Sequence, residues 1–137
     1  MDQTVKRLKA LSDSTRLRIL HLISLTKECC VCEIHEVLDL TAPTTSRSLR
    51  ILEEAGFVAR RRAGKWMHYR LREMDREWTQ VRDHVLVSLD DSTETRTDRN
   101  RFEAWKKTGT CGVNPDPAAI RDAISKQSSQ QTIKDRV

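Results

Sequence analysis

The chain has 137 residues, of which 37% are hydrophobic and 33% charged, and Lys and Arg exceed Asp and Glu by 25 to 20. This length suits one domain of about 100–200 residues. No apolar run approaches the ~18 residues of a membrane helix, and residues 1–6 lack the apolar segment of a signal peptide. We therefore expect a cytoplasmic protein with no membrane partner, in which the four cysteines are reduced thiols.

Apolar residues at helical spacing predict four helices in the first 56 residues. Ser12–Ser14 separate the first two helices, and Asp39–Pro43 form a turn before the fourth, where Pro43 suits a first helical position and Gly56 a C-terminal cap. The third and fourth helices, with the tight turn between them, predict a helix-turn-helix. The apolar positions are Val5, Leu8 and Leu11; Leu17, Ile19, Leu20, Leu22, Ile23 and Leu25; Val31, Ile34, Val37 and Leu38; and Leu49 and Leu52.

A β-hairpin is predicted directly after these helices. Residues 57–60 and 66–71 are rich in aromatic and β-branched residues, and between them Arg61–Lys65 form a basic turn that contains Gly64. A hairpin in this place is the wing of a winged helix, and residues 57–71 are called the wing below. A fifth helix follows, with its apolar face at Met74, Trp78, Val81, Val85 and Leu89.

The predicted fold class is mainly α with a small β-hairpin, a homodimeric winged helix-turn-helix. Residues 1–90 are expected to form the DNA-binding and dimerisation domain. Residues 91–137 are expected to be a polar C-terminal extension, with short helices around Phe102–Trp105 and after Pro117 and a disordered end at Ser125–Val137.

Positive charge is concentrated in the helix-turn-helix and the wing. Residues 42–72 carry eight basic and two acidic residues, whereas residues 1–41 carry six of each. A focused basic patch is typical of a nucleic-acid site. The candidate residues for base edges and phosphates on the fourth helix are Thr44, Thr45, Arg47, Ser48 and Arg50, and those of the wing for phosphates or the minor groove are Arg60, Arg61, Arg62 and Lys65.

A single recognition helix reads only a few base pairs. Useful specificity therefore requires a symmetric dimer on a pseudo-palindromic stretch of double-stranded operator DNA. The first and fifth helices lie outside the helix-turn-helix and are the candidate dimer surface.

Three cysteines, Cys29, Cys30 and Cys32, are predicted at the start of the third helix, where the helix dipole favours thiolates. Clustered thiolates select soft ions. Residues two apart on a helix point to nearly opposite sides, so Cys30 and Cys32 could hold one ion only if the helix start unwinds, whereas Cys29 and Cys32 could do so without distortion. If Cys30 and Cys32 are the pair, binding bends the helix-turn-helix, which links ion and DNA reciprocally.

Four motifs in this order resemble the ArsR/SmtB family of metalloregulatory repressors: Ala10–Leu20, Glu28–Ile34, Ser46–Leu49 and Gly64–Leu71. The resemblance covers about residues 4–90. It implies a homodimeric winged-helix repressor that leaves its operator on binding a thiophilic metalloid or metal. The arsenite and antimonite branch carries the signature Glu-Leu-Cys-Val-Cys-Asp-Leu, whose two cysteines fall on Cys30 and Cys32.

The departures from the family pattern concern the ligands and the operator. Cys29 replaces a leucine and His35 stands where a third cysteine can lie, so the third ligand is Cys29, the distant Cys111, or none from the protein. Residues 1–28 lack the cysteines of the cadmium and lead branch. The fifth helix offers Asp83–His84 without the second histidine of the zinc branch. Ser48 replaces the usual histidine, which indicates a different operator.

These observations favour a transcriptional repressor of an arsenical resistance operon, with As(III) or Sb(III) as inducer and no catalytic cofactor. The alternative within the same fold is another soft-metal sensor or a thiol redox sensor, in which Cys29 and Cys30, or Cys32, oxidise. An enzyme is not expected, because no histidine is evidently tied to a cysteine as a base and Pro117 stands where a phosphatase-like loop around Cys111 would have arginine. A metal carrier would have no use for the basic wing.

Overall fold

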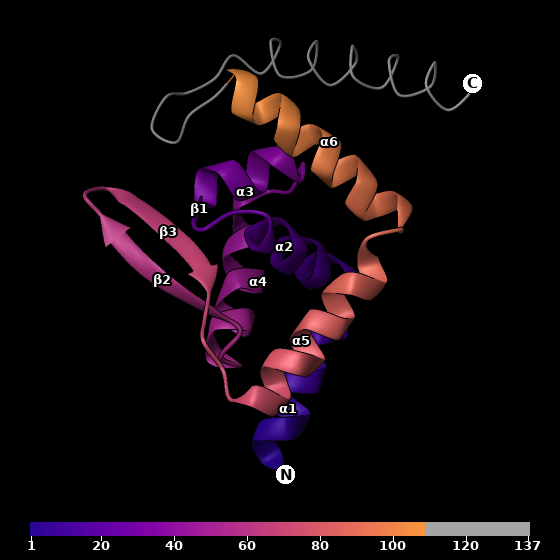
Figure 1. Cartoon of the computed structure of the whole chain (residues 1–137). Coiled ribbons are helices and arrows are strands. Elements are labelled where there is room, and N and C mark those ends of the chain that lie inside the picture. The colour runs from indigo at the N-terminus through magenta and orange to yellow at the C-terminus, as the bar shows by residue number, and fades with distance from the viewer. Residues whose placement is uncertain (109–137) are drawn as a thin grey trace, which may run out of the picture.

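The computed structural model describes residues 1–108 (Figure 1). Within this range, no helix is long and apolar enough to cross a bilayer. The elements in chain order are α1 (Asp2–Leu11), α2 (Ser14–Ser24), β1 (Cys29–Cys30), α3 (Val31–Val37), α4 (Ala42–Glu54), β2 (Val58–Ala63), β3 (Trp66–Leu71), α5 (Arg76–Leu89) and α6 (Thr93–Thr108).

The predicted winged helix-turn-helix is confirmed, and local signals set the ends of its helices. The Asp13 carboxylate accepts the backbone N–H of Arg16 at the start of α2. The Thr41 hydroxyl accepts that of Thr44 at the start of α4. Gly56 follows α4 with a φ of 87°, a conformation that favours glycine. A side-chain cap and the glycine therefore delimit α4, whereas Cys30 at the start of α3 makes no side-chain cap hydrogen bond.

The wing belongs to a three-stranded antiparallel sheet with the order β1-β3-β2. Its third strand, β1, is only two residues long, and the sequence did not predict it: Cys29 pairs with Tyr69, and Cys30 with His68. The predicted five-residue turn is also wrong, because β2 continues to Ala63. The turn is therefore Gly64 and Lys65, with Gly64 at a φ of 60° in the first central position, as two-residue hairpin loops favour.

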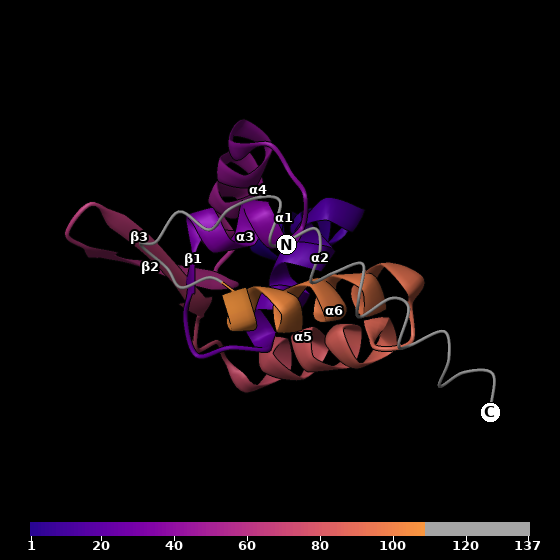
Figure 2. The same cartoon turned by 90° about the horizontal axis from the view of Figure 1, so that it is seen from above.

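The hydrophobic core lies between the helices and the base of the wing. Ile19 and Leu20 of α2, Ile34 of α3, Leu49 of α4 and Phe57 before β2 are fully buried in it. In both views the wing projects away from this helical body (Figures 1 and 2). Some apolar residues that defined the predicted helices are instead exposed: Val5 and Leu8 on α1, Leu25 after α2, and Val81 on α5.

Helix α6 is much longer than the short helix expected around Phe102–Trp105, and it packs against α2 and α3. Phe102 and Trp105 enter the core. The buried Asp98 carboxylate accepts hydrogen bonds of 2.9 and 2.8 Å from the Nε and Nη2 of Arg18, whose Nη2 also donates to the Leu38 carbonyl at the end of α3. The hydrogen bonds that Arg18 donates to Asp98 raise the pKa of Arg18. Residues 93–108 thus share a core with the residues before them.

The remaining expectations for the extension concern Cys111, a helix after Pro117 and the end at Ser125–Val137. They lie outside the described residues.

Candidate nucleic-acid interface and thiol site

Helix α4 presents one polar surface to solvent. Pro43, Ser46, Arg47 and Arg50 are exposed on it, and Thr44 is half-buried. An arginine, a serine and a threonine on one exposed helix face can meet base edges and phosphates in a major groove. Ser46 and Pro43 were missing from the predicted set.

The expectation that Thr45 and Ser48 face outward is wrong. Thr45 is 0% exposed and Ser48 is 7% exposed, and the Thr45 hydroxyl donates to the Thr41 carbonyl at 2.9 Å. These residues stand four positions before Leu49 and Leu52 and therefore share their buried face. A helical projection from the two leucines would have placed both residues inside and Ser46 outside.

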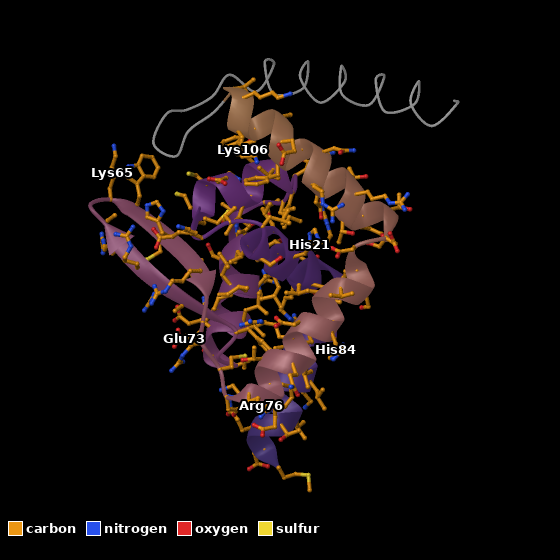
Figure 3. The ribbon with its side chains drawn as sticks, viewed as in Figure 1. His21, Lys65, Glu73, Arg76, His84 and Lys106 are labelled. Atoms are coloured by element: carbon orange, nitrogen blue, oxygen red, sulfur yellow. The ribbon has the colours of Figure 1, made fainter. Side chains whose placement is uncertain are left out.

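The four predicted cations of the wing are exposed, as is Arg70, and the four differ in their partners. Arg60 forms an ion pair of 3.4 Å with Glu53 of α4. Arg61 donates through Nε to the Glu28 carboxylate at 3.0 Å. Arg62 donates to the Gly64 carbonyl, and Lys65 lies at the tip with its ammonium 5.3 Å from the Trp66 ring centre. Figure 3 shows Lys65 at the end of the hairpin farthest from the helices.

Cys30 and Cys32 form a close thiol pair. Their Sγ atoms lie 2.9 Å apart. Cys30 is the extended N-cap residue of α3, with a φ of −74° and a ψ of 146°, while Cys32 lies in the first turn. The helical rule that separates residues two apart does not apply, because only one of the two is helical. The expectation that the helix start must unwind to bring these sulfurs together is therefore wrong.

Cys29 has a different environment. Adjacent strand residues point to opposite faces, so in β1 its side chain faces away from that of Cys30. It is fully buried, and its thiol donates to Glu33 at 3.5 Å. Burial, followed by the neighbouring Glu33, raises the pKa of the Cys29 thiol, and burial also raises the pKa of Glu33. The expected thiolate at a helix start is wrong for this residue, and a Cys29–Cys32 grip is not preformed.

Two sulfur donors 2.9 Å apart are suited to form part of a binding site for a thiophilic ion. Residues 1–108 hold no group of three Cys, His, Asp or Glu side chains placed to bind one ion. A third ligand from the protein must therefore come from a rearrangement of the described residues or from beyond them.

Comparison with known proteins gives this architecture a family. Residues 13–60 match the model described as "Bacterial regulatory protein, arsR family". Over 90 residues the chain is 37% identical to the arsenic resistance transcriptional regulator ArsR2 of Pseudomonas putida, covering 66% of this chain and 76% of that protein. The chain belongs to the ArsR family. This ArsR-family membership confirms the resemblance drawn from the four motifs and agrees with the expectation that the chain is no enzyme, since the family consists of transcriptional regulators.

Two further matches describe relatives of this ArsR-family chain. It is 45% identical over 67 residues to the arsenical resistance operon repressor of Escherichia coli, covering 49% of this chain but only 57% of that protein. Its fold matches a homodimeric winged helix-turn-helix DNA-binding domain, Mb0332 of Mycobacterium bovis, with a TM-score of 0.57 and 29% identity, covering 67% of this chain and 82% of that one.

Proposed function

We propose that the chain is a cytoplasmic, homodimeric transcriptional repressor that binds operator DNA and releases it when Cys30 and Cys32 bind As(III) or Sb(III). The observation that carries this proposal is the pair of sulfurs 2.9 Å apart where the wing sheet meets the helix-turn-helix. Relatives named as an arsenical resistance operon repressor and as an arsenic resistance transcriptional regulator support the choice of inducer.

The DNA surface would consist of α4 and the wing. Arg47 is the candidate for a guanine edge because its guanidinium can donate two parallel hydrogen bonds. Arg50 and Thr44 flank it, and the wing cations Arg60, Arg61, Arg62 and Lys65 would bind phosphates or the minor groove. Two copies would read the two halves of a pseudo-palindrome, as the homodimeric relative suggests.

The position of the thiol pair supports a link between inducer and DNA. Cys30 belongs to β1, which pairs with wing strand β3, and Cys32 belongs to α3, the first helix of the helix-turn-helix. Thiolate sulfurs about 2.3 Å from one ion stand roughly 3.3 Å apart at the near-right angles of a pyramidal three-coordinate ion and roughly 3.8 Å apart in a tetrahedral one, and both separations exceed the 2.9 Å of this pair. An ion that spreads the sulfurs would therefore displace both elements, and this displacement replaces helix unwinding as the proposed coupling.

The proposal includes Cys111 as the candidate for a third ligand of the inducer. Cys111 is three residues beyond Thr108, the end of α6, and α6 packs against the helix that holds Cys32. Three extended residues reach about 10 Å. Replacing Cys111 with serine is expected to weaken arsenite binding if this thiol completes the site, and unchanged titration would leave the pair and solvent as the ligands.

The decisive experiment is a competition series. A labelled duplex is first selected by the protein from a random-sequence pool, and its release is followed by fluorescence anisotropy with arsenite, Sb(III), Cd(II) or Zn(II) under full reduction. We expect release by arsenite or Sb(III) and not by Zn(II). Release by Cd(II) alone would favour another soft-metal sensor, and release only by peroxide without reductant would favour the redox alternative. Absence of salt-dependent DNA binding would contradict the whole proposal.

A further inference from the structure

The thiol pair and a wing arginine lie in one row across the sheet. Cys30 of β1 pairs with His68 of β3, and His68 pairs with Arg61 of β2. Directly opposed residues of antiparallel strands have their side chains on the same face. One face of the sheet therefore carries a thiol of the pair, an imidazole and an exposed guanidinium in register.

Glu28 lies along this row. It stands two residues before Cys30, so an extended backbone places its side chain on the same face. Its carboxylate accepts a hydrogen bond from Arg61 Nε at 3.0 Å and a second one from Arg61 Nη2, and the Nδ1 of His68 lies 3.6 Å away. The hydrogen bonds from Arg61 lower the pKa of Glu28, so the carboxylate is charged at neutral pH.

The contact between Glu28 and Arg61 adds little to the stability of the folded protein. The side chain of Arg61 is 53% exposed and that of Glu28 26% exposed. An exposed ion pair contributes little to folding, because solvent screens it. The contact matters more for orientation, because two parallel hydrogen bonds between a guanidinium and a carboxylate fix the direction as well as the distance of the guanidinium.

We propose that Glu28 is a positioning residue that couples the thiol pair to the wing, by holding Arg61 in a place that changes when Cys30 and Cys32 bind the inducer. This inference rests on the proposed function and adds the route by which inducer occupancy reaches DNA. Glu28 and Cys30 are separated by one residue, so displacement of β1 moves the carboxylate and the guanidinium that it grips. Arg61 then leaves the orientation in which it meets a phosphate.

The test measures coupling separately from binding. The coupling ratio is the DNA dissociation constant with saturating arsenite divided by that without it, obtained for the selected duplex by anisotropy under reduction. Arsenite affinity of the DNA-free protein is measured by calorimetry. The variants are Glu28→Gln, Arg61→Gln and the double variant, and the matched control is Glu73→Gln, which removes an exposed carboxylate at the end of β3.

We expect Glu28→Gln to lower the coupling ratio at least fivefold, the lower end of common allosteric factors of about 5–150, with arsenite affinity within twofold of the wild type. The coupling ratio of the double variant should be no lower than that of either single variant, and the coupling ratio of Glu73→Gln should equal that of the wild type. If Glu28→Gln does not fold, Arg61→Gln breaks the same contact from its exposed side and decides the question.

Three results would overturn the inference. Full coupling in both single variants would show that the contact transmits nothing. Loss of arsenite affinity in Glu28→Gln would place Glu28 in the ion site instead. If the wild type itself keeps its DNA in arsenite, the proposed function fails and the coupling route falls with it. The wild-type measurement therefore separates the two failures.

Discussion

Cys29 and Cys30 are neighbours in the chain, but their thiols have different surroundings. Cys30 lies against Cys32, while Cys29 is turned to the opposite face and buried beside Glu33. The two cysteines of the family signature fall on the pair whose sulfurs lie close together, and their ligand role stays a prediction. The orientation of Cys29 depends on the strand backbone of β1, which a two-residue segment without any periodicity does not reveal.

This difference predicts that the three thiols respond differently to substitution. Cys30→Ser and Cys32→Ser should each raise the arsenite concentration for half-release of DNA by about tenfold or more, a typical size for lost coupling, without weakening DNA binding. Cys29→Ala should release DNA at the wild-type concentration. Anisotropy titrations measure all three, and normal release from both serine variants would exclude the pair as the trigger.

His21 is a second residue whose surroundings set its chemistry. It is 1% exposed, its Nε2 lies 3.4 Å from Asp90 directly after α5, and Arg99 and Asp98 of α6 also face it. Burial, opposed in part by Asp90, lowers the pKa of the imidazole. The unfolded chain, with a histidine pKa near 6.5, therefore binds more protons than the folded protein as the pH falls.

Stability attributable to His21 should consequently decline on acidification. We expect the difference in free energy of unfolding between the wild type and His21→Gln to shrink between pH 7.5 and pH 5.5. Urea unfolding at a series of pH values measures it. Parallel curves for the two proteins would mean that the folded protein takes up the proton without cost.

At the scale of elements, helices with apolar spacing were predictable and two features of the interface were not. The apolar positions of α2, α3 and α4 and the glycine after α4 suffice to place the helix-turn-helix. The buried face of α4 includes the small polar residues Thr45 and Ser48, so a search for apolar residues alone assigns them to the wrong side. The extent of β2 depends on pairing with β3, which local composition does not encode.

Helix α6 is held by a contact that a low apolar density does not disclose. The carboxylate of Asp98 is buried and grips Arg18, which in turn donates to the end of α3. The helix therefore braces the first helix of the helix-turn-helix as well as covering the core.

Asp98→Asn should lower the free energy of unfolding by roughly 1.5–3 kcal/mol, the usual worth of a hydrogen bond to a charged group. Chemical denaturation measures this loss. Asp91→Asn, which neutralises an almost fully exposed carboxylate before α6, is the matched control and should change stability by less than about 0.5 kcal/mol. An equally small effect of Asp98→Asn would show that the buried contact does not brace the fold.

At the scale of the whole molecule, several apolar side chains lie outside the core. Val5 and Leu8 are exposed on α1, and Val81 and Val87 on α5. α1 and the start of α5 are joined by Arg7, whose guanidinium lies 5.1 Å from the Trp78 ring centre. Exposed apolar groups on two connected helices support the proposal that these helices form the dimer interface.

Leu8→Glu is expected to weaken self-association at least tenfold, because a charge would be buried against the apolar surface of the second copy. Sedimentation equilibrium measures the dissociation constant. Gln3→Glu adds the same charge to another side of α1 and serves as the control. A monomeric wild type, or an unchanged dimer in Leu8→Glu, would place the interface elsewhere.

The shortness of β1 has a consequence for the spacer before it. Only two residues of β1 pair with β3, and the length of the chain from the end of α2 to Cys29 sets the register of this pairing. Deleting a single residue at positions 25–27 would advance the strand by one step and exchange its two faces. Cys30 would then take the place of Cys29 opposite Tyr69, and Val31 would stand opposite His68, so the length of this spacer decides which residue joins the row of His68 and Arg61.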